Sequence, residues 1–86
     1  MNWTVNIVRS AARQLRDLPR DRQAQIRQRL REFATNPYQG DVRPLRGEWQ
    51  GYHRRRVGRY RIIFQIDTEN RHVDIVAILP RGTQTY

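Results

Sequence analysis

The sequence predicts an α+β fold in which a helical hairpin covers one face of a small antiparallel sheet. Two patterns and the length of the chain indicate this fold. Apolar residues recur at helical spacing over residues 10–35, whereas residues 52–79 alternate in the manner of strands around two turn-like segments. The chain has 86 residues, which is the length of one domain, so we expect residues 1–86 to fold as a single unit.

The N-terminal third is expected to form a strand followed by a first helix. Residues 3–7 alternate large apolar and polar side chains, which predicts a short strand. Ser10 is the expected N-cap of the helix that follows. Ala11, Leu15 and Leu18 are spaced as one apolar face of that helix, and Pro19 is expected to end or kink it.

A second helix is expected to follow and to complete the hairpin. Asp21 is in position to cap its first turn. Its apolar face is predicted from four residues at helical spacing, namely Ile26, Leu30, Phe33 and Ala34. The pair Asn36-Pro37 should stop the helix, because a residue before proline avoids the helical conformation.

The second half of the chain predicts a loop and then a three-stranded antiparallel meander. Residues 37–51 hold two prolines and three glycines without a sustained period, so we expect a loop that Leu45 and Trp49 anchor to the core. Residues 52–79 read as three strands. Gly58-Arg59 is expected to form a two-residue turn after the first strand, and residues 68–71 a second turn.

The expected turn at Gly58-Arg59 fixes the register of the hairpin. Val57 then pairs with Tyr60, and Arg56 lies opposite Arg61. Because side chains alternate between faces, Arg54, Arg56 and Arg61 should share one face of the sheet. The opposite, apolar face should carry Val57, Tyr60, Ile62, Phe64, Ile66, Val73, Ile75, Ala77 and Leu79.

Two features do not fit a simple two-faced sheet. The face that carries Arg54, Arg56 and Arg61 is called the arginine face. Ile63, Val76 and Ile78 should also lie on it, so it should be covered by the loop, the C-terminal tail or a partner chain. Arg55 falls on the apolar face, so it should reach the end of the sheet, meet an acidic residue or mark a bulge.

Composition narrows the kind of partner. The chain has 17 basic residues, all of them arginine, against 8 acidic ones, for a net charge of +9. This excess points to a polyanion or an acidic protein, although a basic face that merely meets solvent is the simpler alternative. Arginine offers a planar fork that suits phosphate, but it is a poor proton donor or acceptor.

Several function classes are not expected. There is no cysteine, which excludes a disulfide framework and a thiol nucleophile. His53 and His72 stand 19 positions apart without clustered carboxylates, and no glycine-rich loop precedes a helix, so we expect no metal and no small-molecule cofactor. Apolar runs are too short for a membrane span and the N-terminus does not resemble a signal peptide, so we expect a cytoplasmic location without a membrane partner.

The arginine face is the candidate site. Like charges directly opposite each other cost about 0.2–1 kcal/mol, and a phosphate between two guanidiniums reverses that cost. The alternative is a solvated face on which the arginines splay apart. Two residues of the tail, Arg81 and Tyr86, add a further cation and a ring that suits base stacking, or else they form a loose chain end.

Three segments together resemble the RelE/ParE superfamily of toxins from toxin–antitoxin pairs. They are Leu45-Arg46-Gly47, the hairpin from Tyr52 to Phe64 with its Arg-x-Arg-Val-Gly-x-Tyr-Arg pattern, and the late Arg81 followed by Tyr86. The helical hairpin that ends at Asn36-Pro37 is similar as well. The resemblance covers almost the whole chain and implies a RelE-like fold.

In the RelE-like branch, the resemblance implies a metal-free endoribonuclease that cuts mRNA in the A site of the 70S ribosome through attack of the ribose 2′-hydroxyl. By position, Arg54 and Arg56 match basic strand residues of that branch. Arg61 and Arg81 match arginines that hold the scissile phosphate, and Tyr86 matches a C-terminal tyrosine that stacks on a base or assists proton transfer. Some members use Lys or His for proton transfer, whereas His53 is expected to be structural and His72 to lie exposed at a turn.

Two other activities remain open on this reading. A ParE-like toxin would inhibit DNA gyrase without an active site, because the fold does not decide the function. A degenerate member would only bind its antitoxin or nucleic acid. Either toxin implies an acidic, largely disordered antitoxin as partner.

Overall fold

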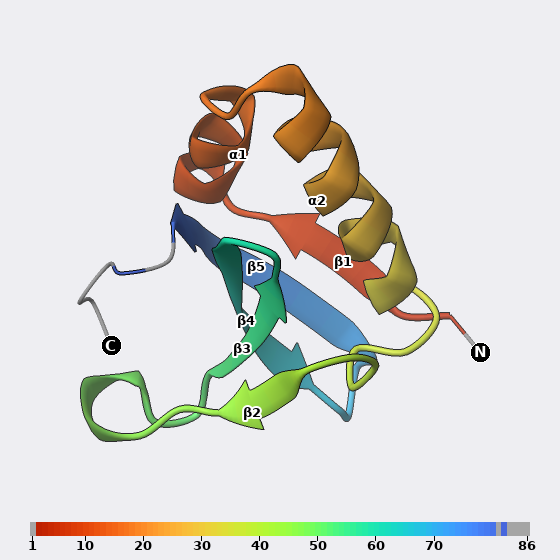
Figure 1. The fold of residues 1–86 in the computed structure, drawn as a ribbon. Coiled ribbons are helices and arrows are strands. Elements are labelled where there is room, and N and C mark those ends of the chain that lie inside the picture. Colours follow the sequence, from red (N-terminus) through yellow and green to blue (C-terminus); the bar gives the residue numbers. More distant parts are fainter. Residues whose placement is uncertain (1, 81, 83–86) are drawn as a thin grey trace.

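The computed structural model describes residues 2–80 and 82 of the chain. Two helices lie over one face of a five-stranded sheet (Figure 1). In chain order the elements are β1 (Thr4–Ile7), α1 (Arg9–Arg16), α2 (Arg20–Phe33), β2 (Val42–Pro44), a short 3-10 turn (Gly47–Trp49), β3 (His53–Val57), β4 (Tyr60–Asp67) and β5 (His72–Pro80). The expected α+β fold, with the helical hairpin on one face, is confirmed.

The strands are ordered β1-β5-β4-β3-β2 across the sheet. The meander β3-β4-β5 is antiparallel as expected, while β1 lies parallel to β5, with Val5 beside Val73. The chain reaches this parallel position through the two helices, which cover the sheet on the way. The core between the layers is built from both helices and the inner strands, namely Ala11, Leu15, Ile26, Leu30, Phe33, Val57, Ile62, Phe64, Val73, Ile75 and Ile78.

The register of the β3-β4 hairpin is as the turn predicts. Val57 pairs with Tyr60 and Arg56 pairs with Arg61. Gly58 has a φ of 56°, which explains why glycine stands at the first position of the turn. The three arginines Arg54, Arg56 and Arg61 therefore belong to one face of the sheet.

The face assignment in β5 was wrong beyond a β-bulge. The register shifts between Ile63 and Phe64, because Ile63 pairs with Ala77 whereas Phe64 pairs with Ile75. The extra residue turns the rest of β5 over. Ile78 thus joins the core, and Ala77 and Leu79, expected there, lie on the arginine face instead.

The segment expected to be a loop contains strand β2. Val42–Pro44 pairs with β3 at the edge of the sheet, where proline is tolerated because no neighbour needs its missing N–H. Leu45 and Trp49 are only partly buried and lie outside the core. Trp49 packs edge to face against Tyr52 at 5.3 Å between ring centroids, so it contacts the residue that precedes β3 instead of the core.

Neither helix begins at the expected cap. Val8 precedes α1 and Pro19 precedes α2, so neither position supplies a capping side chain, and Ser10 lies inside the first turn of α1. Asp21 lies in the first turn of α2, where its charge suits the positive end of the helix dipole. The connection is held by Gln23, whose side-chain amide donates to the carbonyls of Arg16 and Leu18 at 3.0 and 2.8 Å.

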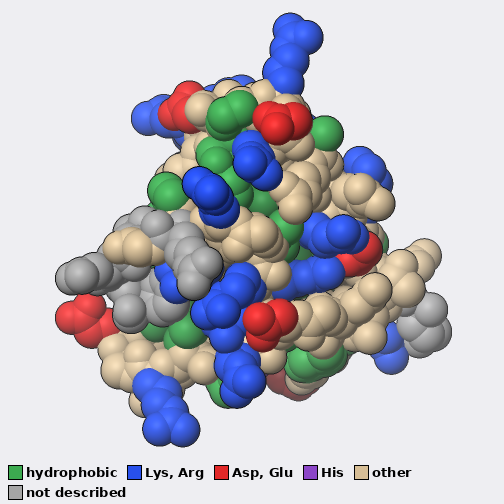
Figure 2. Space-filling model, in the orientation of Figure 1, with side chains coloured by type: hydrophobic (Ala, Val, Ile, Leu, Met, Phe, Trp, Pro, Cys, Tyr) green, Lys and Arg blue, Asp and Glu red, His purple; other side chains and the backbone are tan. Residues whose placement is uncertain are grey.

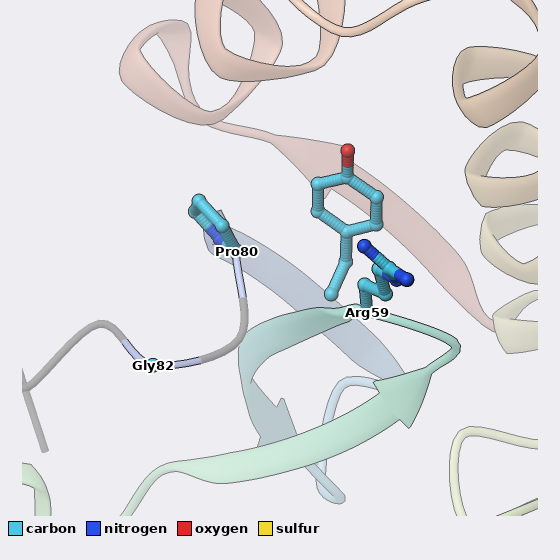
Figure 3. Close-up of a pocket in the computed structure, with 4 residues that line it drawn as sticks. Arg59, Pro80 and Gly82 are labelled. Carbon is cyan, nitrogen blue, oxygen red and sulfur yellow. The ribbon is translucent and has the colours of Figure 1, made fainter.

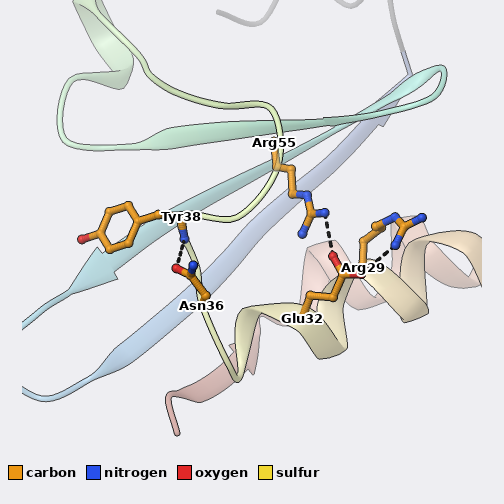
Figure 4. A network of polar contacts seen from close by, with 5 residues as sticks. All are labelled: Arg29, Glu32, Asn36, Tyr38 and Arg55. Atoms are coloured by element: carbon orange, nitrogen blue, oxygen red, sulfur yellow. Dashed lines mark hydrogen bonds and ion pairs between the residues drawn. The ribbon is translucent and has the colours of Figure 1, made fainter. Parts of the chain in front are cut away.

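Arg55 lies on the apolar face and forms an ion pair with an acidic residue there, one of the outcomes expected from the sequence (Figure 4). Its Nη2 lies 2.6 Å from Glu32 Oε1 on α2, and its guanidinium sits over the Phe33 ring at 5.7 Å from the centroid. Arg29 Nη1 binds the other carboxylate oxygen of Glu32 at 2.7 Å. The hydrogen bond from Arg55 lowers the pKa of Glu32 below its ordinary 4.5.

Gly40 borders the same ion pair from the loop before β2. It has a φ of 88°, and a Cβ there would lie 2.8 Å from Arg55 Nε. A larger residue would therefore push the guanidinium away from Glu32.

Neither described helix is long and apolar enough to cross a membrane.

Candidate functional site

Four arginines share the face of the sheet opposite the helices. Arg56 and Arg61 stand directly across the β3-β4 ladder, and Arg54 lies two residues before Arg56 on the same strand. Arg43 of β2 pairs with Arg54 and joins the same face, which the sequence did not predict. The missed signal was the segment Val42-Arg43-Pro44, which is only three residues long and contains a proline. The arginine face thus comprises Arg43 as well as Arg54, Arg56 and Arg61.

The four side chains differ in exposure and in their distance from the carboxylate of Asp41. The Arg54 side chain is 10% exposed, and its Nη1 lies 3.0 Å from the Asp41 carbonyl oxygen and 3.2 Å from Asp41 Oδ1. Arg43 is 74% exposed, with its Nε 4.0 Å from the same Oδ1. Arg56 donates its backbone N–H to the Asp41 carbonyl, and its side chain is exposed. Part of the positive charge is thus already neutralised beside Arg54.

Arg61 lies on β4 between its cross-strand partners Arg56 and Leu79. It is half-buried, and the floor beside it is apolar because Ile63 and Ala77 on the same face are 0% and 8% exposed. A charge on such a floor interacts more strongly with an anion than a fully hydrated one. The structure thus brings Arg54, Arg56 and Arg61 to one face, with Arg54 held in an ion pair. Arg81 and Tyr86 lie outside the described residues.

Positive charge extends beyond this face. Figure 2 shows arginine side chains over both the helical and the strand parts of the molecule, with only scattered acidic groups among them. Helices α1 and α2 contribute arginines such as Arg13 and Arg27, which are exposed. Such a distribution suits an extended polyanion, with the arginine face as one part of its path.

The two histidines are not placed as proton-transfer groups of the arginine face. His53 belongs to the opposite face, where it stacks on Phe64 at 5.7 Å between ring centroids, as the register predicts. Its buried Nδ1 has no hydrogen-bond partner among the described residues. His72 is half-buried rather than exposed, because it begins β5 and its Nε2 lies 3.0 Å from Asp74 Oδ1. Residues 2–80 and 82 contain no cluster of metal-ligating side chains.

Burial lowers the pKa of His53 below its ordinary 6.5, and this sets a pH dependence of stability. As pH falls below 6.5, the unfolded chain takes up a proton on His53 before the folded chain does, so the free energy of unfolding decreases. We expect His53→Phe, which keeps the stacking on Phe64, to remove this part of the decrease in urea titrations between pH 7 and pH 5. An unchanged slope in the variant would contradict the assignment.

Known proteins define the class to which this architecture belongs. The family model described as "ParE toxin of type II toxin-antitoxin system, parDE" matches residues 5–85. No protein of curated function matches the sequence significantly. Two helices on a five-stranded sheet with this topology match RelE-like toxin folds in solved structures.

Three of those structures show the extent of the likeness. The chain is similar to one in the toxin–antitoxin complex RelBE2 from Mycobacterium tuberculosis, with a TM-score of 0.85, 29% identity, and 94% and 100% of the two chains covered. The archaeal RelE-RelB complex from Pyrococcus horikoshii gives 0.81, 25% identity, and 95% and 98%. Isolated RelE from E. coli gives 0.76 at 18% identity, with 96% of this chain and 88% of that chain covered, a likeness of fold alone.

The chain belongs to the ParE toxin family, within the RelE/ParE superfamily. It is a toxin of a type II toxin–antitoxin system. The resemblance seen in the sequence is thereby confirmed at the level of the superfamily. Membership in the superfamily does not decide between RNA cleavage and gyrase inhibition, so we consider the chemistry of the site.

Proposed function

We propose that this toxin is a ribosome-dependent mRNA endoribonuclease that inhibits translation, with residues 1–86 acting as one cytoplasmic toxin domain. The observation that carries the proposal is Arg56 directly opposite Arg61 on the face of the sheet that the helices leave open. A like-charge pair costs folding energy at that position, and a phosphodiester between the guanidiniums offsets it.

The chemistry is a transesterification within the RNA. The 2′-hydroxyl of one ribose loses its proton as its oxygen attacks the adjacent phosphorus. The bond from phosphorus to the 5′-oxygen breaks and that oxygen takes up a proton, which yields a 2′,3′-cyclic phosphate and a 5′-hydroxyl. Arg61 and Arg56 stabilise the negative charge that develops on the phosphate oxygens, assisted by Arg81. Arg54 supports the electrostatic field while it stays paired with Asp41.

Arginine stays protonated at the pH of the cytoplasm, so it does not remove the proton of the 2′-hydroxyl. We propose that Tyr86 stacks on a substrate base or assists this transfer, and that the ribosomal A site aligns the RNA for attack. No metal or small-molecule cofactor is needed for these steps. The enzyme is accordingly expected to be slow on free RNA and faster on ribosome-bound mRNA.

The toxin is proposed to have an acidic antitoxin as its protein partner. Among the similar structures, RelBE2 is a toxin–antitoxin complex and the archaeal protein is a RelE-RelB complex. A disordered acidic chain that folds on binding would neutralise the net charge of +9 and cover apolar surface at the same time.

The second candidate function is inhibition of DNA gyrase without an active site. It is favoured by the family model, whose description names ParE and which matches residues 5–85. Under this function the arginine face would bind a protein surface, and the arrangement of Arg56 and Arg61 would matter only as charge.

The two candidates differ in which process stops first in cells. After induction of the toxin, incorporation of labelled methionine and of labelled thymidine is followed over the first minutes. We expect methionine incorporation to fall first, with new 5′ ends appearing in translated mRNA. A fall of thymidine incorporation that precedes any effect on protein synthesis would replace the ribonuclease proposal with gyrase inhibition.

A further inference from the structure

A hollow at the tip of the β3-β4 hairpin takes no part in the site described above. Its described lining consists of Arg59, Tyr60, Pro80 and Gly82, and its volume is about 540 Å³ (Figure 3). This volume lies in the range of small-ligand pockets. The hollow brings together a phenol ring, a proline ring, a guanidinium and a glycine, with no acidic side chain among these four residues.

We propose that this hollow binds one nucleobase of the RNA, around the hairpin tip from the phosphate held by the arginine face. The inference rests on the proposed function and adds a base-binding subsite to it. The subsite is distinct from the role that the resemblance implies for Tyr86, because Tyr60 precedes Arg61 within the ordered strand β4.

The ring of Tyr60 is held in place before any ligand arrives. Tyr60 is half-buried and packs against the core, so little side-chain freedom is lost when a base stacks on it. Pro80 lies directly across the ladder from Tyr60 and offers a compact apolar ring. Aromatic stacking is tolerant of base identity, and an arginine at the rim adds a cation for the base or its phosphate.

The position of the hollow relative to Arg61 favours an RNA ligand over an isolated anion. Tyr60 and Arg61 are adjacent, and alternation along β4 sends their side chains to opposite faces. Pro80 likewise follows Leu79, the cross-strand partner of Arg61. A nucleotide chain passing around the hairpin tip can therefore place a phosphate beside Arg61 and the neighbouring base in the hollow.

Gly82 also lines the rim of the hollow and contributes no side chain of its own to it. It has a φ of 95°, which favours glycine, and a Cβ at this position would meet no atom of the other described residues within 4 Å.

The test measures binding to a short single-stranded RNA made uncleavable by 2′-deoxy substitution at each candidate cleavage position. One abasic nucleotide is placed at each position in turn, and affinities are measured by fluorescence anisotropy at fixed salt. We expect one abasic position to weaken binding to the wild-type toxin about tenfold, the scale of base–aromatic stacking. Tyr60→Leu should lose most of that difference, because it binds the intact and the abasic RNA almost equally.

Matched variants separate stacking from charge and from folding. Tyr60→Phe keeps the ring and should retain the base preference, which also controls for damage to the core. Arg59→Gln should reduce affinity for the intact RNA more than for the abasic RNA. Arg13→Gln removes the same charge from exposed helix α1 and should weaken both RNAs equally.

A flat abasic scan with the wild-type toxin would overturn the inference. So would a Tyr60→Leu penalty of equal size on intact and abasic RNA, or variants that weaken only the complex with an antitoxin. Because the RNA cannot be cleaved, base discrimination by a toxin that proves inactive as a nuclease would sink the proposed function and leave this subsite standing. Cleavage without base discrimination would do the reverse.

Discussion

Arg61→Ala is expected to cleave ribosome-bound mRNA about 10²–10³-fold more slowly than the wild-type toxin. Arg61 is half-buried beside the apolar floor of Ile63 and Ala77, where water screens its charge less than that of the exposed Arg56. The loss should appear in the rate of the chemical step, measured in single-turnover cleavage on programmed ribosomes. In cells, the same variant should relieve growth arrest.

The control for this variant is Arg13→Ala, which removes an exposed arginine from α1. Both variants lower the net charge equally, so a general electrostatic effect on RNA binding would slow both to the same degree. Equal rates for Arg61→Ala and wild type, with both proteins folded by circular dichroism, would remove the proposed role of the arginine face.

Glu32→Gln is expected to destabilise the fold by about 3 kcal/mol. Arg55 would keep its charge under α2 while losing the carboxylate that lies 2.6 Å from its Nη2, and its Nη1 already lacks a hydrogen-bond partner among the described residues. Glu32 is 25% exposed, so the value is placed at the low end for a broken buried pair. Urea denaturation followed by circular dichroism measures the change.

The double variant Glu32→Gln with Arg55→Met should recover a large part of this loss, because it removes the stranded charge and leaves an apolar chain on Phe33. Low pH should destabilise the wild-type protein in the same way as Glu32→Gln does. The pKa of Glu32 is lowered in the folded state, so its stabilisation is complete above pH 4.5 and disappears as pH falls through the lower folded value. A double variant as unstable as Glu32→Gln alone would contradict this account of the ion pair.

Local pattern was sufficient for most of the fold. Helical spacing predicted both helices, and the turn at Gly58 predicted the register that places Arg56 opposite Arg61. It failed where structure depends on distant partners. β2 is three residues long and contains a proline, so it is stable only because β3 offers its edge.

The bulge in β5 was a second failure of the same kind. Nothing in the alternation around Val76 indicates an extra residue, yet the shift exchanges Ala77 and Ile78 between the two faces. The core thereby gains Ile78, and the arginine face receives Ala77 and, at the end of the strand, Leu79. Packing between the layers, rather than strand propensity, decides this exchange.

The residues themselves determined that the toxin is basic and cysteine-free and that three of its arginines share one side of a hairpin, because charge and alternation are local properties. Only the tertiary structure decided what each arginine does there. Asp41 reaches Arg54 and Glu32 reaches Arg55 across gaps of 13 and 23 residues, and such pairings exist only once β2 and α2 have packed. The consecutive residues Arg54, Arg55 and Arg56 thus differ: Arg54 is paired with Asp41, Arg55 is buried against Glu32, and Arg56 is exposed. They differ because the fold sets the burial of each side chain and its distance to a carboxylate.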